Sequence, residues 1–354
     1  MRIAKRDELT GKNRTIVRII AILSALIFSG IFLSFLGENP LKIYLSMLDG
    51  AMGSGYRLRE TINTAIPLLI TSLGIMIAFK MKFWNIGAEG QILMGAFGAT
   101  FFALHFSYLP KPILLLLMAM GAMVMGGIWL LVPALFKAKF GTNETLFTLM
   151  LNYVAIKWVT FLQYSLWKDP KAMGFPKIAN LGENALLPDV FGVHIGWIIA
   201  LILVGVIYVF LNHTKVGYEI AVIGESENTA RYAGINIRKT IIKTMFIGGA
   251  IVGLTGMIQV SGISGTLSMD LTGGMGYTAI ITTWLSGLSA PVAVIVSFLF
   301  AALEQGGSFI QTAYQIPASV AKVLQSLILF FVLGSEFNMR YKFVLNKRSK
   351  GVEK

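Results

Sequence analysis

Long apolar runs separated by short polar breaks are the feature that most limits what this chain can fold into. A helix needs roughly 20 mainly apolar residues to cross the hydrocarbon core of a bilayer, and the sequence offers several runs of that kind. The chain is 55% hydrophobic and only 13% charged, which leaves too few polar side chains to cover a soluble domain. We expect an all-α integral membrane protein, because membrane-spanning strands would instead give alternating segments of about 10 residues.

The apolar runs predict ten transmembrane helices in a single transmembrane domain over residues 1–354. The expected spans cover residues 16–36, 62–79, 86–105, 112–136, 144–166, 195–211, 241–260, 277–288, 292–310 and 318–333. The first is too long for the core of a cleaved signal peptide and is followed by other spans, so it should be retained. Around residues 277–310 the break is short, and two half-spans are the alternative to one full span there.

The distribution of Lys and Arg predicts which side of the membrane the ends of the chain face. An even number of spans puts both tails on one side, and most of the 30 basic residues fall in inner segments if that side is the cytoplasm. We therefore expect cytoplasmic tails at residues 1–15 and 334–354, a cytoplasmic segment at 212–240, and outer segments at 37–61 and 167–194. The net charge of +13 follows from the same bias, so no nucleic-acid partner is expected.

Several kinds of chemistry have no residues to carry them. The chain has no cysteine and three scattered histidines, so no metal site is expected. Ser264 stands between glycines, but His105, His194 and His213 all precede it at or outside span ends, which leaves a serine protease without its base. The Gly-x-x-x-x-Gly-Lys-[Ser/Thr] phosphate loop is also missing. We expect no enzyme activity of its own and no cofactor.

Polar side chains inside the expected spans mark candidate positions for a translocation path or a broken helix. A carboxylate costs about 2.5 kcal/mol or more at the centre of a bilayer, so it needs a partner or a wet cavity. The candidates are Asn85, Gly87, Glu89, Gly90, Gln91, Asn143, Glu144, Asn152 and Glu304. For Asn143 and Glu144 the alternative is capping, since both stand where a span begins. For Glu89 the alternative is a bond to backbone N–H groups of its own broken helix.

The run from Asn85 to Gln91 predicts a broken helix near that path. Gly87 and Gly90 permit a break and close helix approach, and a broken helix directs free backbone N–H groups at a cavity. Residues 273–287 are similarly short, glycine-bearing and polar at the start. Paired interruptions are typical of inverted repeats, here of five plus five spans, with the substrate route at their interface.

The cytoplasmic segment contains signals for a short helix. Ser226 suits an N-cap, Glu227 suits the first turn, and Gly234 can end the helix in the left-handed conformation. A helix of about two turns is marginal alone in water, so we expect it to be held against its own bundle or a partner protein. A solvated connector packed on the membrane face is the alternative.

Three blocks of the sequence resemble permeases of the ATP-binding-cassette (ABC) family that imports ribose, branched-chain amino acids and nucleosides. Residues 224–235 are similar to the cytoplasmic coupling region of that family, and residues 85–91 to its intramembrane signature. Residues 141–153 resemble permeases that work with basic-membrane-protein-type lipoproteins, which bind nucleosides. The resemblance implies a multi-pass subunit of a type II importer in a bacterial inner membrane, surrounded by lipid.

The resemblance also implies partners and roles. ATP would be bound by two cytoplasmic ATPase subunits. The chain would pair with a second permease, as a heterodimer with a shorter related one rather than as a homodimer. An external lipoprotein would deliver the substrate. The residues expected at the ATPase contact are Glu225, Ser226, Glu227, Asn228, Arg231, Tyr232 and Gly234.

The sequence constrains the substrate less than it constrains the class of transporter. Nucleosides are the first candidate substrates, ribose-like sugars are the second, and riboflavin or branched-chain amino acids come after them. Aromatic side chains such as Tyr153, Trp158 and Phe161 can stack a nucleobase, although residues at helical spacing more often pack against lipid or neighbouring helices. An ion-coupled secondary transporter is the rival of another class, with buried charges such as Glu89 and Lys157 as its coupling sites.

Overall fold

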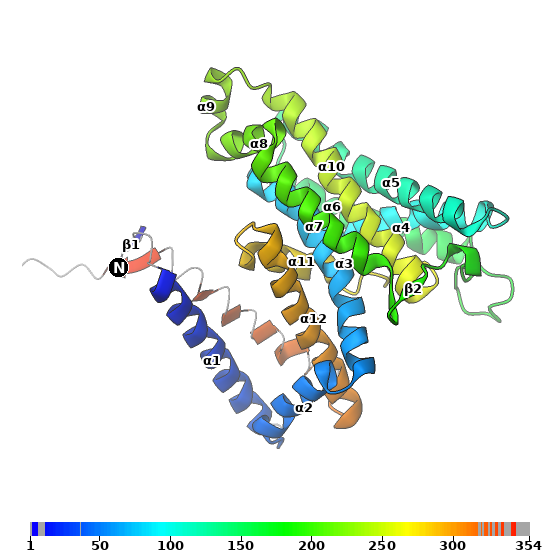
Figure 1. The fold of residues 1–354 in the computed structure, drawn as a ribbon, viewed down its shortest axis with the longest axis horizontal. Coiled ribbons are helices and arrows are strands. Elements are labelled where there is room, and N and C mark those ends of the chain that lie inside the picture. Colours follow the sequence, from blue (N-terminus) through cyan, green and yellow to red (C-terminus); the bar gives the residue numbers. More distant parts are fainter. Residues whose placement is uncertain are drawn as a thin grey trace, which may run out of the picture. The chain divides into compact units, whose positions relative to one another are not determined.

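The chain is a helical protein in the computed structural model (Figure 1), which describes residues 2–5, 11–35, 37–317, 320, 322–324, 326–327, 330–331, 334–335 and 341–344. The expected all-α class is confirmed, since the described residues contain only four short strands beside the helices. The chain groups into two compact units. We call Met1–Arg57 with Ala302–Lys354 the terminal unit, and Leu58–Ala301 the central unit.

Six helices of the described residues are long and apolar enough to cross a membrane. They are α3 (Gly55–Lys80), α5 (Lys111–Phe140), α6 (Glu144–Tyr164), α7 (Gly196–His213), α10 (Ile237–Ile258) with its π-helical end η2 (Gln259–Ser264), and α12 (Ala290–Ala313). A seventh would combine Leu23–Phe35 of α1 (Gly11–Phe35) with α2 (Pro40–Met52), two helices bent by 113°.

The expected number of ten spans is therefore not established. Residues 277–288, expected as a span, form α11 (Met275–Leu285), whose 11 residues make only about 16 Å of helix. Of the expected span over residues 318–333, half of the residues lie outside the described ones, and those that are described are helical. Residues 37–61, expected as an outer segment, contain α2 and the first turns of α3.

Three helices form the inside of the central unit: α4 (Ala88–His105), α5 and α10 pack closely along one another (Figure 1). Glycines on all three helices face a neighbouring backbone. A Cβ added at Gly256 of α10 would lie 2.1 Å from the carbonyl oxygen of Ile92 on α4. Small residues are typical of membrane interiors, where close packing rather than water exclusion holds helices together.

The spanning helices of the central unit differ in how far they are covered. The most apolar window is 78% buried in α3 and 72% in the helix formed by α10 and η2, but only 28% in α6 and 22% in α7. The uncovered side chains of α7 are apolar, for example Leu201 and Ile202. α6 and α7 therefore present outward faces that fit lipid or another membrane protein.

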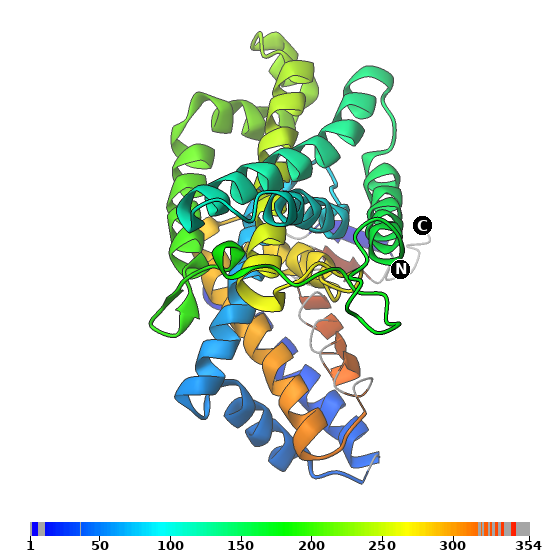
Figure 2. The same ribbon diagram turned by 90° about the vertical axis from the view of Figure 1, so that its right-hand side faces the viewer.

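The segment between α6 and α7, which was predicted to face outside, is mostly irregular chain with a short hairpin (Figure 2). It contains η1 (Glu183–Ala185) and the antiparallel strands β2 (Asp189–Val190) and β3 (Val193–His194). Backbone bonds of 2.8–2.9 Å from Leu181 N–H to Gly265 and from Leu187 N–H to Ser261 tie this segment to η2 and its end.

The terminal unit joins the two ends of the chain. β1 (Arg2–Lys5) pairs antiparallel with β4 (Tyr341–Val344), with Arg2 opposite Val344. Local sequence patterns could not have shown a pairing between segments so far apart. The pairing agrees with the expectation that both tails lie on one side of the membrane.

Candidate functional site

The candidate site begins where α3 ends. After Lys80 the chain runs through a non-helical connection, residues 81–87, before α4 starts at Ala88. The expected broken helix is therefore a connection between two helices followed by the first turn of α4, and no single span is interrupted. Asn85, Glu89 and Gln91 are all buried, as expected for polar groups that need partners at membrane depth.

Asn85 and Gln91 bind one another across the start of α4. Gln91 Nε2 donates to Asn85 Oδ1 at 2.9 Å, and Asn85 Nδ2 donates to Gln91 Oε1 at 3.3 Å. Asn85 Oδ1 also accepts a hydrogen bond from the Gly87 N–H at 2.9 Å. Side-chain amides thus satisfy backbone groups that the first turn of a helix leaves without partners.

Asn152 of α6 supports the same turn from outside. Its Oδ1 accepts from the Gly90 N–H at 2.8 Å, and its Nδ2 donates to the Ile86 carbonyl at 2.9 Å. One buried side-chain amide therefore pairs with a backbone donor in the first turn of α4 and with a backbone acceptor in the connection. Asn can do both because its side chain carries a donor and an acceptor. The structure thus places the Asn152 side chain of α6 against the connection and the start of α4, and its two hydrogen bonds hold them together.

We expect Asn152→Leu to destabilise the protein strongly. It would leave the Gly90 N–H and the Ile86 carbonyl buried and unpaired, at about 1–3 kcal/mol each. The measurement is thermal unfolding of the purified chain in detergent. The control is Asn228→Leu, at an exposed position of residues 212–240, which we call the coupling segment. Equal unfolding temperatures for the two variants would show that these hydrogen bonds are not formed.

Glu89 binds a different helix from its own. Its Oε1 accepts from the Gly276 N–H at 2.8 Å. This N–H group belongs to the first turn of α11, where free donors and the helix dipole stabilise a carboxylate. The alternative that Glu89 bonds to its own helix is therefore wrong, because Asn85 and Asn152 already occupy donors there.

The two segments that the sequence analysis compared meet at this carboxylate. A Cβ added at Gly276 would lie 2.6 Å from the backbone nitrogen of Glu89, so the starts of α4 and α11 touch. At the other end of α11, the Trp284 ring stacks on Trp84 of the connection, with ring centroids 5.5 Å apart and planes 19° apart. Both ends of α11 thus contact residues 84–89.

A third group of contacts comes from the corner between α5 and α6. Asn143 caps α6, since its Oδ1 accepts from the Leu146 N–H at 3.2 Å. Glu144 does more than begin the helix: Lys137 Nζ lies 2.7 Å from its Oε2, and its Oε1 accepts from the Trp84 N–H at 3.5 Å. Lys137 was not among the residues predicted for this site, although a basic residue seven positions before an acidic one, across the corner between two helices, is a signal in the sequence.

The predicted short helix of the cytoplasmic segment is confirmed. It is α9 (Glu227–Tyr232); Ser226 Oγ accepts from the Thr229 N–H at 3.3 Å, and Gly234 has a φ of +73°. Ala230 is fully buried, so α9 is held on its own bundle. A second helix, α8 (Lys215–Glu225), precedes it and was not expected.

Most residues predicted at the ATPase contact are free to meet a partner. The exposed members are Glu225, Glu227, Asn228, Arg231, Tyr232 and Gly234. Tyr232 is 93% exposed, so its ring is accessible to a second protein. Ser226 is half-buried because it caps the helix.

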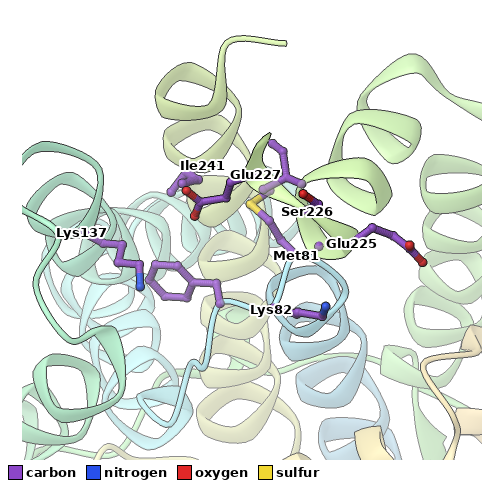
Figure 3. Close-up of a pocket in the computed structure, with 10 residues that line it drawn as sticks. Met81, Lys82, Lys137, Glu225, Ser226, Glu227 and Ile241 are labelled. Atoms are coloured by element: carbon purple, nitrogen blue, oxygen red, sulfur yellow. The ribbon is translucent and has the colours of Figure 1, made fainter. Parts of the chain in front are cut away.

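The coupling segment and the α3–α4 connection lie side by side. A Cβ added at Gly224, near the end of α8, would lie 2.1 Å from the carbonyl oxygen of Lys80. A cavity of about 220 Å³ opens between them (Figure 3). Its lining comprises Met81, Lys82 and Phe83 of the connection, residues 223–227 of the coupling segment, and Lys137 and Ile241. Two groups predicted separately thus form one site.

Glu304, the last of the predicted path residues, belongs to the terminal unit. It lies on α12 with an exposed side chain, and its carbonyl accepts from Ser308 Oγ at 3.1 Å. The buried carboxylates Glu89 and Glu144 are both in the central unit.

The chain is a helical membrane protein in which a short helix, α9, lies near a buried polar connection. Residues 58–333 match the family described as "Branched-chain amino acid transport system / permease component". The chain belongs to this family, which confirms the resemblance seen in the sequence. It is an ABC permease and a multi-pass protein of the cell membrane.

Relatives match over almost their whole length. The glucose ABC transporter permease protein TsgB13 of Haloferax volcanii is 32% identical over 92% of this chain and 88% of its own. The nucleoside ABC transporter permease protein NupB of Lactococcus lactis subsp. cremoris is 29% identical, covering 90% and 91%. The guanosine ABC transporter permease protein NupP of Bacillus subtilis is 27% identical, covering 96% and 97%.

Proposed function

We propose that the chain is the membrane-spanning subunit of an ATP-driven importer of nucleosides. The observation that carries this proposal is α9, whose buried Ala230 holds it on the bundle while its charged and aromatic side chains stay exposed. A rigidly mounted helix of this kind fits a groove on a second protein. Because the chain has no phosphate loop, that second protein supplies ATP hydrolysis.

The proposed mechanism runs through the contact between Gly224 and Lys80. When ATP closes the ATPase subunits, they push α9 and with it the end of α8. Since Gly224 leaves no space against the Lys80 carbonyl, the push reaches the α3–α4 connection directly. The connection holds α11 through Glu89 and Trp84, so α4 and α11 would shift together and open a path between this chain and a second permease.

Nucleosides are the proposed cargo, with an external lipoprotein delivering them. Support comes from the residues 141–153 block and from two of the three relatives, which are named as nucleoside and guanosine permeases. Glucose is the second candidate, because the relative with 32% identity is named as a glucose permease. A heterodimer with a second, related permease is the proposed assembly.

The test is reconstitution in liposomes with an ABC ATPase, a second permease and a substrate-binding lipoprotein from the same organism. We expect uptake of radiolabelled guanosine or uridine that requires ATP and all partners, and little uptake of glucose. ATP-dependent uptake of glucose alone would overturn the cargo. Uptake by the isolated chain under an ion gradient, without ATP, would overturn the importer and favour a secondary transporter.

A further inference from the structure

The chain between η2 and α11 is irregular. Residues 265–274 form neither helix nor strand, and α11 begins directly after them at Met275. We call residues 265–274 the irregular segment. It ends in two glycines with left-handed backbone, Gly273 with a φ of +55° and Gly274 with a φ of +94°, a conformation that glycine adopts without strain.

Contacts with α6 show at which depth of the membrane the irregular segment lies. The Met269 N–H donates to Gln163 Oε1 at 3.3 Å, next to the end of α6 at Tyr164. Just beyond the segment, the Tyr277 hydroxyl accepts from Asn152 Nδ2 at 3.4 Å. Asn152 stands in the middle of α6, about 18 Å from its end at a rise of 1.5 Å per residue. The chain therefore descends from one end of this spanning helix to its middle.

The first turn of α4 gives the same depth for the start of α11. Gly276 touches the backbone of Glu89, as described above. The next residue of α4, Gly90, donates its N–H to Asn152 Oδ1 at 2.8 Å, so Glu89 and Asn152 lie at one level. Two independent sets of contacts thus place the start of α11 near mid-membrane and the irregular segment in the half above it.

Lipid cannot cover irregular backbone at this depth. Backbone N–H and C=O groups outside a helix are tolerated within the hydrocarbon region only where protein buries them or water reaches them. Asp270 and Gly273 are exposed, and nothing lies within 4 Å of a Cβ built at Gly273. The described part of this chain therefore leaves one side of the segment open to water or to a second permease.

Asp270 favours water on that side. It is the only charged residue between Lys243 and Glu304, and its carboxylate forms no ion pair within the part of the chain that the structure describes. Lys157, exposed on α6 at a similar level, does not bind it. A carboxylate without a partner at membrane depth is costly, and such groups normally face a water-filled cavity.

We propose that the irregular segment lines the water-filled translocation path and that Asp270 makes this path selective against anions. A negative charge between walls of low dielectric constant repels anions more strongly than it would in open water. This inference rests on the proposed function and names the charge of the cargo. Neutral or cationic molecules such as nucleosides and sugars pass, whereas their phosphorylated forms are repelled.

The absence of cysteine from the sequence allows a labelling test at this depth. Tyr277→Cys would be reacted, in the fully assembled transporter in liposomes, with methanethiosulfonate reagents that carry either a positive or a negative charge. Val206→Cys is the control, because Val206 lies near the middle of α7 and is 53% exposed. We expect labelling at 277 to be at least about tenfold faster, since the reactive thiolate forms in water and is suppressed in apolar surroundings. Ser268→Cys, a conservative change within the segment, repeats the measurement if Tyr277→Cys fails to fold.

The charge of the reagents tests Asp270. Each rate is divided by the rate of the same reagent with a free thiol, and the corrected positive rate should exceed the negative one. Asp270→Asn should lower this ratio at least about threefold, the effect of one charge about 12 Å away even at the dielectric constant of water. Glu183→Gln, at an exposed position between α6 and α7, is the matched control and should leave the ratio unchanged.

Two outcomes would overturn the proposal. Labelling at 277 and 268 as slow as at 206 would mean that lipid or the second permease covers the irregular segment. Fast labelling with a ratio that Asp270→Asn does not change would mean that the path is wet but does not select by charge.

A transport measurement separates this inference from the proposed function. After reaction with the reagent, Tyr277→Cys should lose ATP-dependent guanosine uptake, while reacted Val206→Cys should keep it. If the unaltered complex shows no such uptake, the proposed function fails, and the labelling rates still decide whether the segment faces water. If the complex transports guanosine and both reacted variants do so equally well, only the irregular segment fails as part of the path.

Discussion

Gly256→Ala should leave little of the protein folded at growth temperature. The added Cβ would lie 2.1 Å from the Ile92 carbonyl oxygen and 2.3 Å from the Ala96 nitrogen. Both are backbone atoms of α4, so no side chain can turn aside and α10 has to move away from α4. Overpacking of a tight core costs about 1–3 kcal/mol when side chains can adjust, and we expect at least the upper end here.

The measurement is the temperature at which the purified chain loses its monodisperse peak on size-exclusion chromatography in detergent. Gly205→Ala is the matched control, because nothing lies within 4 Å of a Cβ at that position of α7. There the extra methyl should be neutral or slightly stabilising, since alanine favours helix over glycine. Two variants that unfold at the same temperature would mean that α4 and α10 do not approach so closely.

Exchanging the charges of α9, as Glu227→Lys with Arg231→Glu, should abolish uptake while the chain stays folded. Both side chains are exposed, and they stand four residues apart, so the exchange keeps the net charge and an i, i+4 pair. At a contact with an ATPase it would bring like charges together, which costs several kcal/mol. A cost of about 2.7 kcal/mol corresponds to a hundredfold weaker complex.

Three readouts are needed for this variant: ATP-dependent uptake, co-purification of the ATPase subunit, and thermal unfolding. We expect the first two to be lost and the third to be unchanged. The same exchange between Lys177 and Glu183, two exposed residues of the outer segment, should leave the ATPase subunit bound. Normal uptake by the α9 variant would contradict the proposed coupling role.

Local signals explain what the sequence could predict. Ser226 and Gly234 stand at the two ends of α9 and act through their own turn, so the helix could be placed before its surroundings were known. The same holds for Asn143, which caps α6 from its own chain segment. Long apolar runs likewise predicted the membrane class, although a run of apolar residues does not show whether a helix as short as α11 crosses a bilayer.

Contacts between residues far apart in the chain could not be predicted from the sequence. Glu89 was expected to have some partner, but its choice of the Gly276 N–H depends on how α11 packs against α4. The contact between Gly224 and Lys80 depends in the same way on the packing of α8 against the end of α3. Each glycine was visible in the sequence, yet a glycine alone does not tell which backbone will approach it.

The bond between Glu89 and the Gly276 N–H has a consequence for how the protein is made. The two residues are 187 positions apart, and a ribosome adding about 5–20 residues per second needs roughly 10–40 s to synthesise that interval. During this time the carboxylate of a newly made α4 has no α11 to bind. The start of α4 therefore has to stay near the aqueous edge of the insertion machinery, and it reaches its final depth only after α11 has emerged.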